Sequence, residues 1–192
     1  MMPKFEPSFS NSMPEEFFLQ KAEILARKLL GKVLVKKEDS HFLAAMIVET
    51  EAYLPQNDFA SHSAVGLTKR NAAMFEKGGI LYVYKSYGIH HCVNCVAGEK
   101  GVGTGVLLRA AIPLLGIDEM KARRKSEKIE TLCKGPGNLG KAFGFTLKDN
   151  LASLRSKELF FQSYKEIKEE NIMVTKRIGI TKSAELELRF LI

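Results

Sequence analysis

The 192-residue sequence has no tryptophan, only three cysteines and no long apolar run. A helix needs about 20 consecutive apolar residues to cross a bilayer, so we expect no membrane-spanning segment. Residues 1–13 have no apolar stretch behind a basic start, which argues against a secretory signal and favours a cytoplasmic protein, or a nuclear one in a eukaryote. Three cysteines in a chain of this size suit a reducing compartment better than a disulfide framework.

Acidic residues are outnumbered, since 22 aspartates and glutamates stand against 29 lysines and arginines. The resulting net charge of +7 favours a polyanionic partner, because each phosphate that a protein neutralises releases a counterion. Part of the excess gathers in residues 121–128 and continues at Lys134 and Lys141. Taken alone, that cluster is more simply the solvated end of a helix.

The apolar pattern predicts a single α+β domain over residues 1–192, with 1–13 as a flexible N-terminal segment. Residues 12–15 have the form of a capping box before a helix that ends at Gly31. Further helices are expected at 116–127 and just before Gly144. Strands are expected at 32–37, 42–53, 80–85, 89–97, 106–112 (stopped by Pro113), near 159 and 172, and at 177–180 and 186–192. Because the connections are short, the sheet should be curved, mainly antiparallel and open-barrel-like, with flanking helices and a protruding β-hairpin.

The segment 47–53 carries the strongest functional signal. Two carboxylates, Glu49 and Glu51, interrupt an apolar strand, and strand alternation places them on the same face as Tyr53. A carboxylate beside an aromatic ring combines a general base with a flat surface for a flat substrate, which points to chemistry on a nucleobase. Two solvated glutamates at the rim of a sheet would explain this segment alone equally well.

Two polar residues interrupt other apolar strands. Arg109 ends the run 106–108 and needs a carboxylate partner, for which Glu49 and Glu51 are the candidates. It either holds a catalytic carboxylate charged and contacts phosphate or the attacking water, or it forms a plain ion pair. Asn94 has the donor and acceptor groups to read a base edge, unless the backbone satisfies its amide.

Tyrosines gather in the stretch 82–87, which holds three of the five in the chain. Tyr82 and Tyr84 share one face of a strand, whereas Tyr87 stands at the turn before Gly88. An exposed aromatic ring at a hairpin tip can wedge between base pairs. The plain alternative for Tyr87 is a ring packed over its own hairpin.

A short motif before the helix expected near Gly144 could bind an anion. Lys134, Gly135 and Gly137 are expected to contact phosphate, because backbone N–H groups at a helix start attract anions, although a simple helix-initiating turn fits equally well. The motif is not a Walker A loop, since no Gly-Lys-Ser/Thr follows. Cys92 and Cys95 form a C-x-x-C, but three residues along a strand place them on opposite faces, so we expect no metal and no cofactor.

These segments occur in one order: Val48-Glu49-Thr50-Glu51-Ala52-Tyr53, His62-Ser63, Arg70-Asn71, Met74-Phe75, Leu81-Tyr82-Val83-Tyr84, Tyr87-Gly88, Cys92 with Asn94, Val106-Leu107-Leu108-Arg109-Ala110, Pro113 and Gly135-Pro136-Gly137. The ordered set closely resembles the alkyladenine (3-methyladenine) DNA glycosylase family. The likeness runs from about residue 18 to residue 145 and is weaker beyond it.

The resemblance implies a monomeric, monofunctional DNA glycosylase of base excision repair that flips a damaged nucleotide out of double-stranded DNA. It would hydrolyse the N-glycosidic bond of alkylated purines such as 3-methyladenine and 7-methylguanine, with hypoxanthine as a further candidate. The implied roles are these: Glu51 as general base, Arg109 supporting the water, Tyr53, His62 and Tyr84 stacking on the base, Asn94 as selectivity filter, and Tyr87 filling the gap in the duplex.

The chain departs from the family at two places. His90 and His91 stand where the family tends to carry aromatic or apolar residues, and residues 186–190 replace a strand that often reads Pro-Trp-Arg-Phe. Three other functions remain open on the sequence. They are a non-catalytic binder of damaged DNA, an RNA-binding protein that uses the same basic face, and a zinc enzyme.

Overall fold

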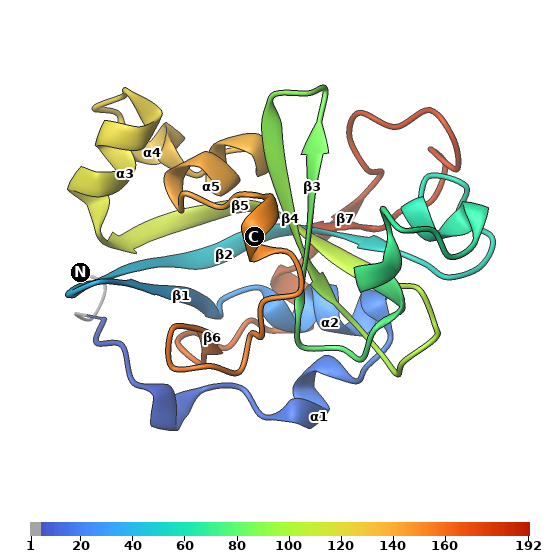
Figure 1. The fold of residues 1–192 in the computed structure, drawn as a ribbon, viewed down its shortest axis with the longest axis horizontal. Helices are drawn as coiled ribbons and strands as arrows, with labels where there is room; N and C mark the ends of the chain where they lie inside the picture. The colour runs from blue at the N-terminus through green and yellow to red at the C-terminus, as the bar shows by residue number, and fades with distance from the viewer. Residues whose placement is uncertain (1–4) are drawn as a thin grey trace.

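The computed structural model describes residues 5–192 and confirms a single α+β domain built around a curled antiparallel sheet (Figure 1). The sheet follows the order β3-β4-β5-β2-β1-β6, and the β7–β8 pair joins it along β2. Its strands are β1 Val33–Glu38, β2 His41–Tyr53, β3 Leu81–Ser86, β4 His90–Val96, β5 Gly105–Leu115, β6 Leu159–Gln162, β7 Met173–Thr175 and β8 Arg189–Leu191. Within residues 5–192, no helix is long and apolar enough to span a membrane.

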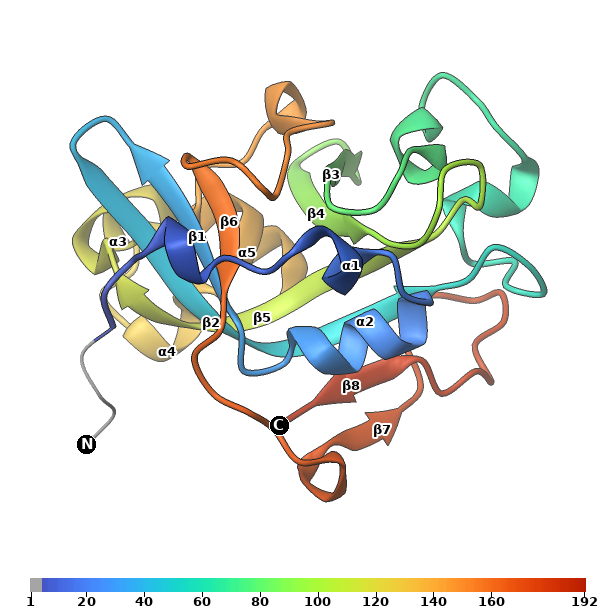
Figure 2. The ribbon, with the colours of Figure 1, turned by 90° about the horizontal axis from the view of Figure 1, so that it is seen from below.

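Short helices flank the sheet: α1 Glu15–Phe18, α2 Ala22–Leu29, α3 Ile117–Arg124, α4 Ile129–Leu132 and α5 Pro136–Ala142. Single 3₁₀ turns stand at η1 Phe9–Asn11, η2 His62–Val65, η3 Ala72–Phe75, η4 Leu147–Asp149 and η5 Glu169–Asn171. Helix α2 runs beside β2 and β8 (Figure 2), and α5 packs against β4 and β5. The main hydrophobic core fills the space between these helices and the inner face of the sheet.

Strand β1 shows how alternation divides the apolar residues between two cores. Leu34 belongs to the main core, whereas Val33 and Val35 point to a second cluster on the other face, with Phe5 and Phe160. A stretch of strand that is buried on both faces reads as a continuous apolar run, as the first three residues of β1 do.

Strand β2 is the central strand of the sheet and carries Glu49 and Glu51. Its first half pairs with β1, its second half pairs with β8, and β5 lies along its other edge. The register against β5 shifts between Ile47 and Glu49 and again between Glu49 and Thr50. Such irregularities bend a strand and change the direction of its side chains. The two glutamates lie at this bend, where the partner of β2 on one edge changes from β1 to β8.

Strands β3 and β4 form the predicted protruding hairpin, which rises above the sheet in Figure 1. Its tip is a tight turn in which Tyr87 and Gly88 both have positive φ, at 49° and 72°. A left-handed conformation is uncommon for a residue with a side chain, and here it directs Tyr87 away from the hairpin.

The N-terminal predictions need correction. Ser12 is not the N-cap of α1, a position that Pro14 takes; it forms an isolated bridge with Gln162, and the expected single helix is divided into α1 and α2. Of the segment predicted to be flexible, residues 1–4 lie outside the described residues. From Phe5 on, the chain packs against the sheet, and Met13 donates a backbone hydrogen bond to Phe161. The flexibility of residues 5–13 stays a prediction.

Two other boundaries were also wrong. Pro113 does not stop β5, which continues to Leu115; the proline sits next to a register shift, where a missing N–H is tolerated. Residues 177–180 form no strand, because the backbone N–H of Ile178 is directed to a side-chain carboxylate instead of a neighbouring strand.

Candidate active site

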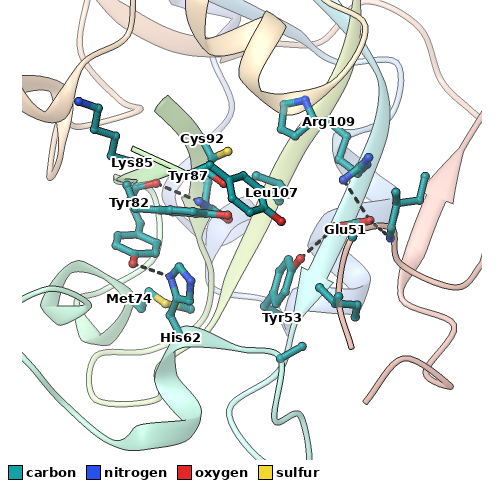
Figure 3. A pocket seen from close by; sticks show the side chains of 18 of the residues that line it. Glu51, Tyr53, His62, Met74, Tyr82, Lys85, Tyr87, Cys92, Leu107 and Arg109 are labelled. Carbon is teal, nitrogen blue, oxygen red and sulfur yellow. Dashed lines mark hydrogen bonds and ion pairs between the residues drawn. The ribbon is translucent and has the colours of Figure 1, made fainter. Parts of the chain in front are cut away.

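A cavity of about 440 Å³ opens beside the β3–β4 hairpin, bounded by β2, β5, the turn at His62 and the segment before β8 (Figure 3). Its lining includes all the residues assigned above to catalysis, base binding and the gap in the duplex: Glu51, Tyr53, His62, Tyr84, Tyr87, Asn94 and Arg109. They come from four strands, β2 to β5, from the turn of the hairpin and from the loop that holds His62, so the curvature of the sheet brings them together.

Glu51 is fully buried at one side of this cavity. Its Oε1 accepts a hydrogen bond of 2.8 Å from the Ile178 N–H and lies 3.3 Å from Nη1 of Arg109, while its Oε2 accepts one of 3.0 Å from the Tyr53 hydroxyl. Burial raises the pKa of Glu51 above its ordinary value, although Arg109, Ile178 and Tyr53 all oppose that rise. A raised pKa brings a carboxylate closer to the range in which a general base works best.

Arg109 belongs to a chain of alternating charges. Its Nε donates to Oε1 of Glu49 at 2.8 Å, and the same oxygen accepts a 2.6 Å hydrogen bond from Nε of Arg189 on β8. Burial alone would raise the pKa of Glu49, but the two guanidinium groups hold it below its ordinary value. Arg109 therefore contacts both carboxylates at once, and Arg189 binds Glu49 from the other side. This geometry fits both a structural ion pair and an arginine that supports a catalytic carboxylate.

Aromatic rings form the opposite wall of the cavity. Tyr82 and Tyr84 stack with centroids 5.5 Å apart, and His62 stands edge-on to Tyr84 at 4.5 Å. Nδ1 of His62 shares a 2.8 Å hydrogen bond with the Tyr82 hydroxyl. Burial, helped by the nearby Arg70, lowers the pKa of His62, so its ring is neutral at pH 7. Tyr82, which the sequence did not place in the pocket, thus orients a pocket residue.

Asn94 lines the same cavity and is also anchored by the backbone. Its Nδ2 donates a 3.1 Å hydrogen bond to the carbonyl oxygen of Tyr82 across the hairpin. The side chain is buried, so this bond fixes which way the amide faces. Asn94 therefore lines the pocket and also has an amide that is bonded to the backbone.

Tyr87 stands at the mouth of the cavity with 87% of its surface exposed. A ring packed over the hairpin would be largely covered, so the plain alternative for this tyrosine is wrong. An exposed aromatic ring at a hairpin tip is placed where it can wedge between base pairs.

The sequence did not predict the role of the segment before β8, which contacts Glu51 and Tyr53 through Ile178 and Arg177. Arg177 and Asp58 form a fully buried ion pair with two contacts of 2.7 Å, and the Arg177 guanidinium lies 4.7 Å from the centre of the Tyr53 ring. Ile178, the next residue, supplies the N–H that binds Glu51. The one available signal was Asp58 itself, a carboxylate in the long polar loop that follows β2.

Comparison with known proteins decides the class. A model of the family described as methylpurine-DNA glycosylase (MPG) matches residues 16–192. The chain belongs to this family. The relationship confirms the resemblance inferred from the motifs, and it makes the protein a DNA glycosylase, a hydrolase of N-glycosyl compounds that acts on DNA.

Several relatives match this glycosylase over nearly their whole length. It is 45% identical over 182 residues to a protein of Methanoculleus marisnigri, which covers 93% of this chain and 94% of that protein. Proteins of Francisella tularensis and Chlorobium phaeobacteroides are each 43% identical, covering 87% and 90% of this chain and 88% and 87% of their own. All three carry the name "Putative 3-methyladenine DNA glycosylase".

The residues expected to contact phosphate lie beside the first residues of β4 in the glycosylase. Lys134 is exposed, Gly135 has a φ of +96°, and Pro136 lines the cavity. A Cβ at Gly137 would lie 2.8 Å from the ring of His90, so only glycine allows this close packing. Phosphate binding by this segment remains a prediction.

The cysteines of the glycosylase are separated as alternation predicts. Cys92 lines the cavity, whereas Cys95 lies in the main core on the other face of β4. Burial raises the pKa of both thiols, which are protonated at neutral pH. Among residues 5–192, no group of three histidine, cysteine or acidic side chains is arranged to hold a metal ion.

Proposed function

We propose that this glycosylase removes alkylated purines such as 3-methyladenine and 7-methylguanine from double-stranded DNA, by flipping the damaged nucleotide into the cavity, as a step of base excision repair. The observation that carries the proposal is a buried carboxylate, Glu51, facing a wall of aromatic rings across a cavity of about 440 Å³. Enzymes that act on a base must take it out of the stacked duplex, at a cost of a few kcal/mol.

The chemistry requires one carboxylate. A purine alkylated at N3 or N7 is cationic, so the bond from its nitrogen to C1′ is already weak, and aromatic faces favour the positive charge. Glu51 takes a proton from water, the water oxygen bonds to C1′, and the base leaves with the electrons of the C1′–N bond. Arg109 keeps the carboxylate charged and supports the water. Most sugar hydrolases need a second carboxylic acid to protonate the leaving oxygen, which a cationic base makes unnecessary.

A monofunctional reaction without strand cleavage is supported by the position of the lysine in the lining. Lys85 lies across the cavity from Glu51 (Figure 3), so its amine is not placed to attack the same C1′ as the activated water. We therefore infer hydrolysis to an abasic site, with no covalent intermediate on the protein.

Lesion range follows from charge. Hypoxanthine is neutral, so its departure needs more help from the protein than that of a cationic base. His62 has a lowered pKa and offers a hydrogen bond but no proton at neutral pH. We infer that cationic purines are removed faster than hypoxanthine, with Asn94 filtering the base at the pocket edge.

The proposed contacts with DNA lie around the mouth of the cavity. Tyr87 fills the gap that the flipped nucleotide leaves, a role supported by its exposure at the hairpin tip. Lys134, Gly135 and Gly137 contact the phosphate backbone nearby. The protein acts as a monomer, and it is expected where the DNA is, in the cytoplasm of a prokaryote or the nucleus of a eukaryote.

The deciding experiment is single-turnover base release from alkylated duplex DNA, with EDTA present. The native protein is compared with Glu51→Gln and with Glu158→Gln, a control that neutralises an exposed glutamate. We expect release by the native and control proteins and a loss of about 10²–10⁴-fold for Glu51→Gln, the usual contribution of a general base. Release by Glu51→Gln at the native rate would remove Glu51 from its role. Tight lesion binding without release by any of the three would leave a damage-recognition protein instead.

A further inference from the structure

The ion pair between Asp58 and Arg177 is unusual in being completely shielded from solvent. Both side chains are fully buried, and Nε of Arg177 is without a hydrogen-bond partner among residues 5–192. Two charges removed from water gain little net stability, and well-packed apolar residues often serve as well or better. The pair therefore calls for an explanation beyond the stability of the fold.

Arg177 contacts the strand on which Glu51 stands. Its Nη1 donates a 3.1 Å hydrogen bond to the carbonyl oxygen of Ala52, and its guanidinium covers the ring of Tyr53. Its own chain neighbour, Ile178, provides the N–H that binds Oε1 of Glu51. One side chain thus fixes two of the three hydrogen-bonding or charged partners of that carboxylate.

Asp58 completes the attachment from the other side. Its Oδ2 accepts a 3.0 Å hydrogen bond from the N–H of Leu54, and its Oδ1 accepts one of 3.2 Å from the N–H of Ala60. These bonds hold the turn that leaves β2 and leads towards His62. The pair therefore joins the loop after β2 to the segment before β8, and Glu51 lies between the two.

We propose that Asp58 and Arg177 are positioning residues that hold the Glu51 carboxylate in its working orientation, so that their loss slows base release while damaged DNA still binds. The inference rests on the proposed role of Glu51 as general base. A carboxylate has about four acceptor positions, and Ile178, Arg109 and Tyr53 occupy three of them. The remaining position is the one left for water. Residues 176–183 have no regular structure to hold Ile178 in place without Arg177.

The charge of Arg177 also reaches Glu51. The ionisable groups that face this carboxylate are Tyr53 on its own strand, Tyr84 on β3, Cys92 on β4, Arg109 on β5 and Arg177. Burial raises the pKa values of the tyrosines and the thiol, which are uncharged at neutral pH. The two arginines are therefore the charges that lower the pKa of Glu51, and removing one of them moves the acid limb of the rate profile to higher pH.

The test uses three variants and two measurements. Asp58→Asn combined with Arg177→Met removes the pair without leaving a buried lone charge, and Arg177→Lys keeps the charge but loses the two-pronged geometry. Lys32→Met is the control, since it removes a largely buried cation that is paired with Glu166 away from the cavity. Single-turnover release from duplex DNA containing 7-methylguanine is measured against pH, normalised to the DNA-binding fraction, together with the Kd for that DNA.

We expect the double variant to release base at least tenfold more slowly, with its acid limb at higher pH and its Kd within threefold of native. Arg177→Lys should lose part of the rate and keep the native acid limb, and Lys32→Met should keep both. A folded double variant with the native rate and profile would overturn the inference, as would a rate loss matched by an equal loss of binding.

Two further outcomes are decided in advance. If the double variant does not fold, Arg177→Lys decides alone: an unchanged rate overturns the inference, and a slower rate with unchanged binding supports it. Failure of the proposed function is a different result, because the native protein or Glu51→Gln would then already give the wrong answer. Native release, an inactive Glu51→Gln and a fully active double variant would overturn the positioning role alone.

Discussion

Replacing Glu51 by glutamine should make the protein more stable while it abolishes most of the activity. Glutamine has the same shape, and its carbonyl oxygen can accept from Ile178 and Arg109 in place of Oε1. Its amide nitrogen then faces the Tyr53 hydroxyl, which can rotate to accept a hydrogen bond instead of donating one. The Ile178 N–H, the Arg109 guanidinium and the Tyr53 oxygen each keep a partner on the glutamine, so the main change is the loss of a buried charge.

The sign follows from the raised pKa of Glu51. Above pH 4.5, the ordinary pKa of a glutamate, the unfolded chain loses this proton first, and ionising the folded protein at higher pH then reduces its stability. Glutamine has no such loss, so the stability gain of Glu51→Gln should be absent below pH 4.5, grow as the pH rises, and level off above the pKa of the folded state. A twofold ratio of acid constants is worth about 0.4 kcal/mol, and a tenfold ratio about 1.4 kcal/mol.

Thermal unfolding of both proteins across pH measures this difference. For a domain of this size, 1 kcal/mol changes Tm by about 2–4 °C, so even the twofold ratio gives a shift of about 1–2 °C. Glu158→Gln, which neutralises an exposed carboxylate, is the control and should show no such pH-dependent gain. A Glu51→Gln protein less stable than native at pH 7–8 would refute the reasoning, because it would mean that the charged carboxylate stabilises the fold.

Three further substitutions test other parts of the molecule. Tyr87→Ser should weaken binding of damaged duplex about tenfold in an anisotropy titration and leave Tm unchanged, because the ring is exposed; unaltered affinity would rule out the wedge. Glu49→Gln should slow single-turnover release about tenfold with little change in Kd, because Arg109 loses one of its two carboxylates; a native rate would show that Glu51 alone holds the guanidinium. Gly140→Ala should lower the free energy of unfolding in urea by about 1–3 kcal/mol, because its Cβ would collide with the carbonyl oxygen of His91; an unchanged midpoint would show that α5 shifts freely.

The parts of the site that could be predicted are those set by local alternation. Glu49, Glu51 and Tyr53 share a strand, so a period of two is enough to place them on one face. The hairpin is equally local, because a short turn between two apolar strands defines it. The distribution of Cys92 and Cys95 to opposite faces of β4 follows from the same rule.

The unpredicted parts depend on contacts between distant residues. Arg177 meets Asp58 across 119 positions, and no local pattern reports such a pairing. The apolar residues Ile178 and Ile180 made this stretch look like a strand, whereas tertiary structure directs the N–H of Ile178 to a carboxylate. Pro113 misled in a different way, because a proline stops a regular strand but is tolerated beside a register shift.

Order of synthesis gives the C-terminal segment a further meaning. Glu51 leaves the ribosome 127 residues before Ile178, and Arg189 follows later still. While residues 52–177 are being made, Glu51 therefore has neither the Ile178 N–H nor the Arg189 guanidinium that binds Glu49. A chain that stops early would carry the reactive carboxylate without the geometry to use it. Unfinished copies of this enzyme should thus be unable to leave abasic sites in the genome, and activity should appear only when the last strand has joined β2.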